Sequence, residues 1–177
     1  MNNRILRLQH VVLSAFLFAI SANSFAQDTL VVVFGIVKDL TSGTPLTEFA
    51  VTATEQKTMT QVPAHLRDNG RYEINIMQEG DYTVEFNAPG HVAKRVQLEL
   101  RGPSPEQWKG GYGMSIDINL FRKVEGLDLT LDGKPIGICR FDQAANIFNW
   151  DLGYTEAQRG RIEELMKEYE RRVPSAR

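Results

Sequence analysis

The residue types that most often carry catalysis are few in this chain, and their spacing does not assemble a site. Two of its three histidines, His65 and His91, lie beyond the first 26 residues. A catalytic zinc ion needs three protein ligands, commonly two histidines and a carboxylate. His65 and His91 are 26 positions apart, and neither lies in an H-x-x-E or H-E-x-x-H spacing. The sequence therefore predicts no zinc site.

Other catalytic patterns are also missing from the sequence. No serine lies in a G-x-S-x-G elbow, and no Walker or dinucleotide-binding glycine pattern occurs. Asp128, Asp132 and Asp142 do not match the spacing of a calcium loop, and Asp132 is better explained by a turn. Nothing selects two of the 22 acidic residues as a glycosidase pair. We therefore predict no catalytic residue, no metal and no cofactor, and expect a protein that is not an enzyme.

Cys139 is the only cysteine, so the chain cannot form an intramolecular disulfide. It lies in the segment 136–141, whose composition is typical of a strand. We expect Cys139 to be buried as a small apolar residue. The alternative is a reactive or intermolecular thiol.

The loop predicted over residues 101–113 contains the two residues that we single out as a ligand- or partner-binding site. Trp108 and Tyr112 stand there among glycines and prolines, which favour exposed loops. Exposed aromatic rings can stack on a sugar or anchor a protein partner. The alternative is that both rings fold back onto the core, as we expect for Trp150, which alternates with Phe148 in a short strand pattern.

Residues 1–26 have the three parts of a secretory signal peptide. Arg4 and Arg7 form a positive start, an apolar run covers 11–20, and small residues surround the expected cleavage site after Ala26. The apolar run is about half of the roughly 20 residues that cross a bilayer, so a retained membrane anchor is the weaker alternative. We expect export across the inner membrane to a periplasmic or outer-envelope location, with no stable membrane span after cleavage.

The charge balance argues against nucleic acid as a partner. The chain carries 20 Lys and Arg against 22 Asp and Glu, a formal net charge of −2. Residues 1–26 include two arginines and no acidic residue, so the mature chain is more acidic still. Nucleic-acid binders are usually basic. We expect an envelope protein or a glycan as the partner.

From residue 30 to residue 141 the hydrophobic period is two, with turn residues about every ten positions. This pattern predicts a mostly β fold, a sandwich or a barrel. The run 30–37 is apolar on both faces and predicts a central strand. Residues 72–76 and 82–86 predict two neighbouring strands whose side chains pair on one face.

The later part of the chain predicts further strands and one helix. Alternation over 114–120 predicts a strand, and Asp132-Gly133 predicts a hairpin between 127–131 and 135–141. The stretch 55–67 is polar and predicts no strand of its own.

The last segment changes to a helical period. Thr155 and Gln158 have the spacing of a capping box. The apolar stripe of the predicted helix, at i, i+3, i+4 and i+7, consists of Ile162, Leu165, Met166 and Tyr169. We expect this amphipathic helix over 155–173 to dock on the chain's own sheet, with a partner-binding helix as the alternative.

Four short motifs lie at predicted turns and strand starts: 34–39 (FGIVKD) with 43–46 (GTPL), 68–72 (DNGRY), 80–84 (GDYTV) and 89–91 (PGH). They resemble the carboxypeptidase regulatory-like domains, which recur in Gram-negative cell-envelope proteins. The resemblance implies a prealbumin-like (transthyretin-like) antiparallel β-sandwich without catalytic residues over 27–101. The polar insertion 56–67 departs from the family pattern.

Beyond that module, we expect residues 102–154 to form further strands and loops of the same or an appended β unit. This part resembles the C-terminal region of exported proteins that carry the same module. We expect the protein to act in cell-envelope protein interaction or scaffolding. The alternative function is a carbohydrate-binding module that uses the exposed loop aromatics Trp108 and Tyr112.

Overall fold

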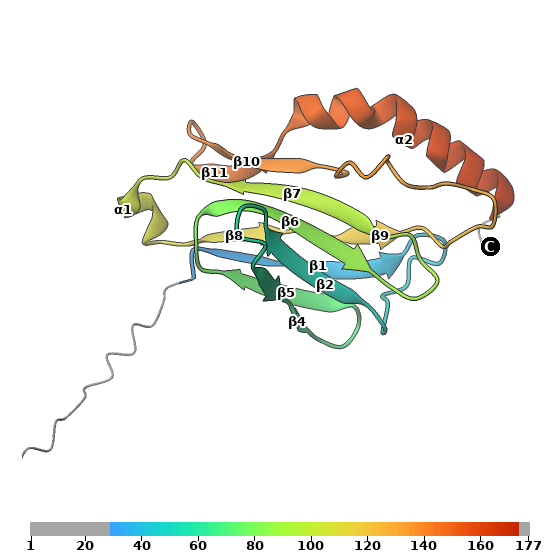
Figure 1. The fold of residues 1–177 in the computed structure, drawn as a ribbon, viewed down its shortest axis with the longest axis horizontal. Helices are drawn as coiled ribbons and strands as arrows, with labels where there is room; N and C mark the ends of the chain where they lie inside the picture. The colour runs from blue at the N-terminus through green and yellow to red at the C-terminus, as the bar shows by residue number, and fades with distance from the viewer. Residues whose placement is uncertain (1–28, 174–177) are drawn as a thin grey trace, which may run out of the picture.

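The computed structural model describes residues 29–173, which form two facing β-sheets and a long C-terminal helix (Figure 1). The predicted mostly β sandwich with a C-terminal helix is confirmed. The predicted signal peptide, residues 1–26, lies outside the described residues. No helix in 29–173 is long and apolar enough to cross a membrane.

One sheet has five strands in the order β4-β5-β1-β8, with β9 also paired to β1. The other sheet has six strands in the order β11-β10-β7-β6-β2-β3. The five-stranded sheet consists of β1 (Val31–Asp39), β4 (His65–Leu66), β5 (Arg71–Ile76), β8 (Tyr112–Ser115) and β9 (Ile118–Leu120). The six-stranded sheet consists of β2 (Ala50–Glu55), β3 (Gln61–Pro63), β6 (Gly80–Asn87), β7 (Lys94–Leu100), β10 (Ile138–Asp142) and β11 (Ile147–Trp150). Two helices, α1 (Pro105–Trp108) and α2 (Leu152–Arg172), complete the fold.

The strand β1 is central, as predicted, because it pairs with β5 on one side and with β8 and β9 on the other. The strands that follow residue 101 join the two sheets of the first module: β8 and β9 run parallel to β1, and β10 runs parallel to β7.

The core lies between the sheets and is built by the period-two alternation. One pairing prediction is wrong: β5 and β6 are consecutive in the chain but belong to opposite sheets. Their apolar side chains therefore meet across the core, with the Tyr72 and Phe86 rings edge to face at 5.4 Å between centroids. The fully buried side chains include Val31, Val33, Val37, Ile74, Ile76, Val84, Phe86, Val96, Leu98 and Leu100.

The predicted strand over 114–120 is interrupted where its backbone approaches β1. A Cβ on Gly35 would lie 2.1 Å from the carbonyl oxygen of Ile116, so only glycine fits there. The Asp117 carboxylate accepts a hydrogen bond from the Ile36 backbone N–H at 3.0 Å. A side-chain acceptor thus replaces a ladder hydrogen bond, and the pairing resumes in β9.

Three local predictions differ from the structure. The polar stretch 55–67 contains two short strands, β3 and β4. The turn at Asp132 and Gly133 is present, with φ of 53° and 75°, but residues 127–131 form no strand. Leu129 and Leu131 instead pack against α2, so tertiary burial explains the leucines that suggested a hairpin.

The helix α2 begins three residues earlier than predicted. Its N-cap is Asp151, whose carboxylate accepts from the Tyr154 N–H, so the prediction of Thr155 as the cap is wrong. The stripe prediction is confirmed: Leu165 and Tyr169 are buried, and their neighbours on the stripe pack beside them. The helix docks on the chain itself, but on the segment 121–136 rather than on a sheet face.

Candidate functional site

The aromatic loop predicted as a binding site is folded into the edge of the sandwich. Trp108, the last residue of the short helix α1, is only 7% exposed. Its ring lies edge to face with Tyr112 at 5.4 Å between centroids and 5.8 Å from the ring of Phe148. The expectation of an exposed Trp108 is therefore wrong, because β8 and β11 each present an aromatic ring that covers it.

Tyr112 is half-buried in the same cluster. Its ring packs against Phe148 at 5.1 Å and Phe141 at 5.9 Å, and its hydroxyl donates to the Asn146 side chain at 3.2 Å. The rings fill the gap between edge strand β8 of one sheet and β11 of the other. The structure thus brings the two predicted residues together, in a cluster that closes one side of the sandwich.

The lone cysteine and the aspartates serve local structure. Cys139 is 1% exposed in β10, as predicted, and burial raises the pKa of its thiol to about 12. Asp128 accepts hydrogen bonds from the N–H and hydroxyl of Thr130, and Asp142 accepts from two backbone N–H groups of its own turn. In residues 29–173 no three His, Cys, Asp or Glu side chains lie close enough to hold a metal ion.

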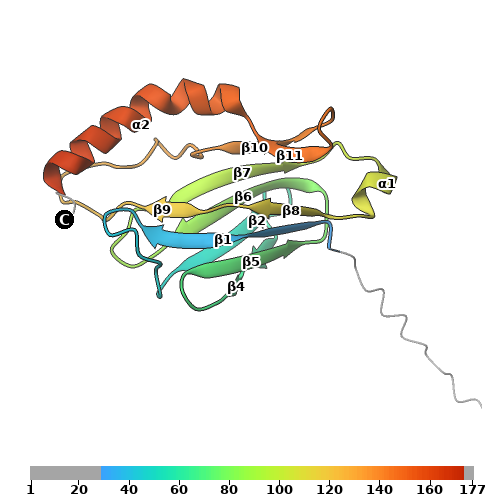
Figure 2. The same ribbon diagram turned by 180° about the vertical axis from the view of Figure 1, so that it is seen from behind.

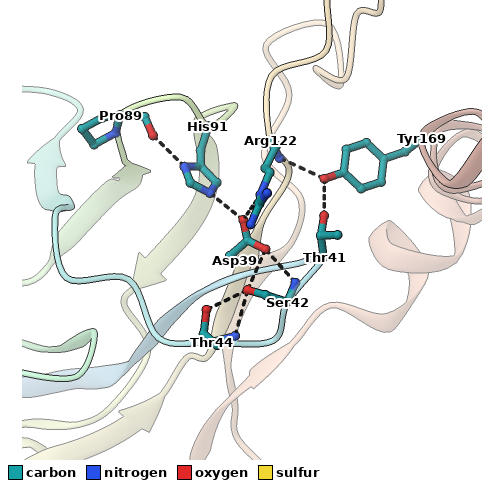
Figure 3. A network of polar contacts seen from close by, with 8 residues as sticks. All are labelled: Asp39, Thr41, Ser42, Thr44, Pro89, His91, Arg122 and Tyr169. Carbon is teal, nitrogen blue, oxygen red and sulfur yellow. Dashed lines mark hydrogen bonds and ion pairs between the residues drawn. The ribbon is translucent and has the colours of Figure 1, made fainter. Parts of the chain in front are cut away.

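A polar network, which the sequence did not predict, surrounds the buried side chain of Asp39 at the end of β1 (Figure 3). Asp39 is 2% exposed, and Oδ2 accepts from Arg122 Nε at 2.6 Å and lies 3.0 Å from His91 Nε2. Its Oδ1 accepts from the backbone N–H and the hydroxyl of Ser42, at 2.7 and 3.0 Å. One carboxylate therefore joins the end of β1, the segment after β6 and the segment after β9.

The protonation of Asp39 follows from these contacts. Burial alone would raise the pKa of the carboxyl, but the hydrogen bonds from Arg122, Ser42 and His91 outweigh it and hold the pKa well below its ordinary value. The Asp39 carboxylate is therefore ionised in the folded chain over the whole neutral range.

The geometry of the network does not suit general base catalysis. His91 Nε2 faces Asp39, and Nδ1 lies 2.8 Å from the carbonyl oxygen of Pro89. Each ring nitrogen thus faces an oxygen acceptor, and neither offers a free lone pair to a substrate. His65 lies exposed in the edge strand β4.

The network also fastens α2 to the sandwich. The Tyr169 hydroxyl lies 2.6 Å from the hydroxyl of Thr41 and accepts from the Arg122 backbone N–H at 3.2 Å. Because Arg122 also holds Asp39, a single chain of contacts runs from β1 to the last turns of α2 (Figure 3). We interpret this cluster as structural.

The outward face of the five-stranded sheet is the most distinctive open surface. In the central strand β1, Val32, Phe34 and Ile36 point outward, because the alternate residues Val31, Val33 and Val37 are buried. Phe34 is 44% exposed. Figure 2 shows this sheet facing the viewer with neither α1 nor α2 over it.

The outward face of the six-stranded sheet has the opposite character. Apart from Ala50 at the start of β2, the outward side chains of its central strands β2, β6 and β7 are polar or charged; they include Thr52, Thr54, Thr83, Glu85, Arg95, Gln97 and Glu99. A water-facing sheet surface normally alternates in this way, apolar inward and polar outward. The apolar row on β1 is therefore an exception within the same molecule.

Polar side chains flank that row on both sides. Phe34 pairs with Glu73 of β5 and with Ser115 of β8, and Val32 pairs with Asn75 and Gly113. The Phe34 ring lies close to Gly113, where a Cβ would be 3.6 Å from the ring. The surface is thus a narrow apolar ridge within a polar rim.

Comparison with known proteins identifies the first module. Residues 32–107 match the carboxypeptidase regulatory-like domain family, as the motifs had suggested. Comparison with curated proteins finds no match.

Comparison with solved structures gives partial and distant matches. Catechol 1,2-dioxygenase from Acinetobacter sp. ADP1 is 14% identical over 64% of this chain, with a TM-score of 0.41, and the match spans 59% of that enzyme. The dioxygenase domain of a carbohydrate-binding protein fusion from Streptomyces sp. SirexAA-E is 13% identical over 56% of this chain and 85% of its own, with a TM-score of 0.39. The pilus 2b backbone protein of group B streptococcus is 11% identical over 53% of this chain and 42% of its own, with a TM-score of 0.34.

These likenesses are too remote to assign an activity, and the family assignment rests on the sequence match alone. The comparisons therefore show a carboxypeptidase regulatory-like domain within the chain, at residues 32–107.

Proposed function

We propose that this protein is a non-catalytic interaction module that binds a protein partner through the outward face of the five-stranded sheet. The observation that carries the proposal is the apolar ridge of β1, Val32, Phe34 and Ile36, with Phe34 44% exposed in a central strand. Protein interfaces commonly have an apolar centre that contains an aromatic anchor, surrounded by a polar rim. The ridge and its neighbours Glu73, Asn75 and Ser115 fit that description.

The absence of a catalytic role is part of the proposal. Two observations support this non-catalytic role. Both ring nitrogens of His91 already face oxygen atoms of the chain, and Cys139 is buried with a raised pKa that leaves its thiol protonated. The proposal also includes the cellular location of the protein. The pattern of residues 1–26 supports export to the periplasm or the outer envelope.

The carbohydrate-binding alternative loses its main support. Stacking on a sugar needs an open aromatic face, and the Trp108 ring is covered by Tyr112 and Phe148. No other observation favours a glycan.

The test compares Phe34→Thr with a matched variant. Threonine keeps a high strand propensity, so Phe34→Thr should fold normally while it removes the aromatic anchor. Ile147→Thr, in the edge strand β11, is the control because Ile147 is similarly exposed at 47%. Both variants and the unaltered protein are used to capture partners from envelope extract under mild crosslinking.

We expect a defined protein that is captured by the unaltered chain and by Ile147→Thr but lost with Phe34→Thr. Equal capture by all three would reject the proposed face. A glycan array run in parallel tests the alternative: glycan binding that is lost on Tyr112→Ala would replace the proposal with a carbohydrate-binding function.

A further inference from the structure

A pocket of about 430 Å³ lies between the sandwich and the layer made by α2 and the segment 121–136. Figure 2 shows that layer above β7 and β9. The volume is within the roughly 300–1,000 Å³ of small-molecule sites. The pocket is separate from the β1 ridge, so the inference drawn from it does not depend on the proposed function.

The walls of the pocket are largely apolar. The helix supplies Ile162, Leu165 and Met166. The segment 121–136 supplies further apolar side chains, Phe121, Leu129, Leu131 and Ile136. Such a lining suits an aliphatic chain.

One lysine points into this apolar space. Lys94 is the first residue of β7 and pairs with Phe86 of β6, so it shares the inward face of the sheet with a fully buried ring. Its ammonium lies 4.2 Å from the centroid of the Phe121 ring. The Lys94 side chain is half-buried, and desolvation lowers the pKa of its amine to about 8.

The other charged groups of the pocket leave Lys94 without a counter-ion. Arg95 is held by Glu85 at 2.6 Å, and Asp117 accepts from the backbone N–H of Ile36. Lys134 adds a second cation to the lining. Among the ion pairs of residues 29–173, neither Lys94 nor Lys134 takes part.

We propose that this pocket binds a single-chain aliphatic carboxylate, with the head group on the Lys94 ammonium and the chain along the apolar face of α2. Keeping a lysine in an apolar pocket without a carboxylate partner opposes folding, since desolvation disfavours the charged amine. An anionic head group would supply the missing charge, and the pocket's remaining surface would cover the chain. The unpaired charged groups of the lining are two cations, Lys94 and Lys134, and one anion, Asp117, so the net charge favours an anionic head group over a cationic one.

The test is isothermal titration calorimetry of the purified protein with sodium dodecanoate below its micelle concentration. Two comparison ligands have the same alkyl chain but a different head group: dodecanol is neutral, and dodecyltrimethylammonium is cationic. Lys94→Met removes the charge, Lys94→Arg keeps it, and Lys57→Met, at an exposed turn, is the control. Phosphatidylglycerol vesicles distinguish a free carboxylate from an anionic membrane surface.

We expect one dodecanoate per chain, with affinity reduced about tenfold or more by Lys94→Met, roughly 1.4 kcal/mol, and little changed by Lys94→Arg or Lys57→Met. The cationic analogue should bind at least about tenfold more weakly than dodecanoate. Dodecanoate binding that is absent, or equal for the cationic analogue, or insensitive to Lys94→Met would overturn the proposal, as would binding to vesicles alone. If Lys94→Met does not fold, the head-group comparison on the unaltered protein decides.

Discussion

Asp39 has a buried side chain whose two carboxylate oxygens both take part in hydrogen bonds. Its lowered pKa has a consequence for stability. An unfolded aspartate titrates near 3.9, so the ionised group stabilises the fold above that pH, and this stability is lost as the pH falls toward the folded value.

Replacing Asp39 by Asn should therefore do two things. At pH 7 the free energy of unfolding should fall by about 3 kcal/mol, because Arg122 and His91 lose a buried anionic partner. Between about pH 5 and pH 2 the variant should lose less further stability than the unaltered chain. Urea unfolding at several pH values measures both, with the exposed Asp68→Asn as control. A variant that keeps the full acid dependence would show that Asp39 is not its source.

Lys94 gives the same direction of pH dependence at alkaline pH, but its charged form opposes folding instead of stabilising the fold. Its folded pKa of about 8 lies below the ordinary value of a lysine, so the unfolded chain binds more protons between these values and stability rises with pH. Arg95, Asp117 and Lys134 also face the pocket. We expect Lys94→Met to be more stable than the unaltered protein at pH 7 and to lack the rise from pH 7 to 9.5. Thermal unfolding across that range measures it; a less stable variant would contradict the account.

Trp108 is buried, and its indole N–H has no hydrogen-bond partner among residues 29–173. Trp108→Ala should lower the free energy of unfolding by about 4 kcal/mol, because it leaves a cavity beside Tyr112 and Phe148. Trp108→Phe keeps a ring and removes the unpaired donor, so its cost should be about 1 kcal/mol. Denaturant unfolding compares the two variants. Little loss with Trp108→Ala would indicate instead that the ring is exposed in solution.

At the scale of elements, α2 depends on the segment beneath it. Leu165 is 4% exposed against Phe121 and Leu129, whereas Leu152 on the same helix is 75% exposed. Leu165→Ala should cost about 3 kcal/mol, and Leu152→Ala less than about 0.5 kcal/mol. Thermal and urea unfolding test this pair, and equal effects would show that the helix is not docked as described.

The elements also show how far periodicity predicts this fold. The apolar run 30–37 correctly predicted β1, alternation correctly predicted β5 and β6, and the helical period correctly predicted the buried stripe of α2. Alternation cannot tell which sheet a strand joins, and so β5 and β6 were paired wrongly. It also cannot separate leucines of a strand from leucines buried under a helix, as at 127–131.

The candidate surfaces were harder to predict than the strands. Residues 30–37 are apolar on both faces, which predicted the central strand correctly but did not indicate that Phe34 is exposed on its outward face. The Asp39 network depends on topology, which brings together segments far apart in the chain. The sequence did contain one indication of the network. Asp39 lies an even number of residues from Val33 and Val37, so it points inward with them, and a buried charge needs hydrogen-bond partners.

At the scale of the whole molecule, the two sheets have different outward surfaces, one polar and one with an apolar ridge. The remaining sides are occupied, by the aromatic cluster at one edge and by α2 with its segment at another. This asymmetry is the reason to place a protein partner on the five-stranded sheet, whereas the proposed carboxylate site is the separate pocket under α2.

The central claim is that Phe34 contacts a partner protein in the cell envelope. The most direct measurement is photocrosslinking in living cells with benzoylphenylalanine placed at position 34, and at position 147 for comparison. We predict a discrete protein adduct from position 34 that position 147 does not give. No adduct at position 34, or the same adducts from both positions, would contradict the claim.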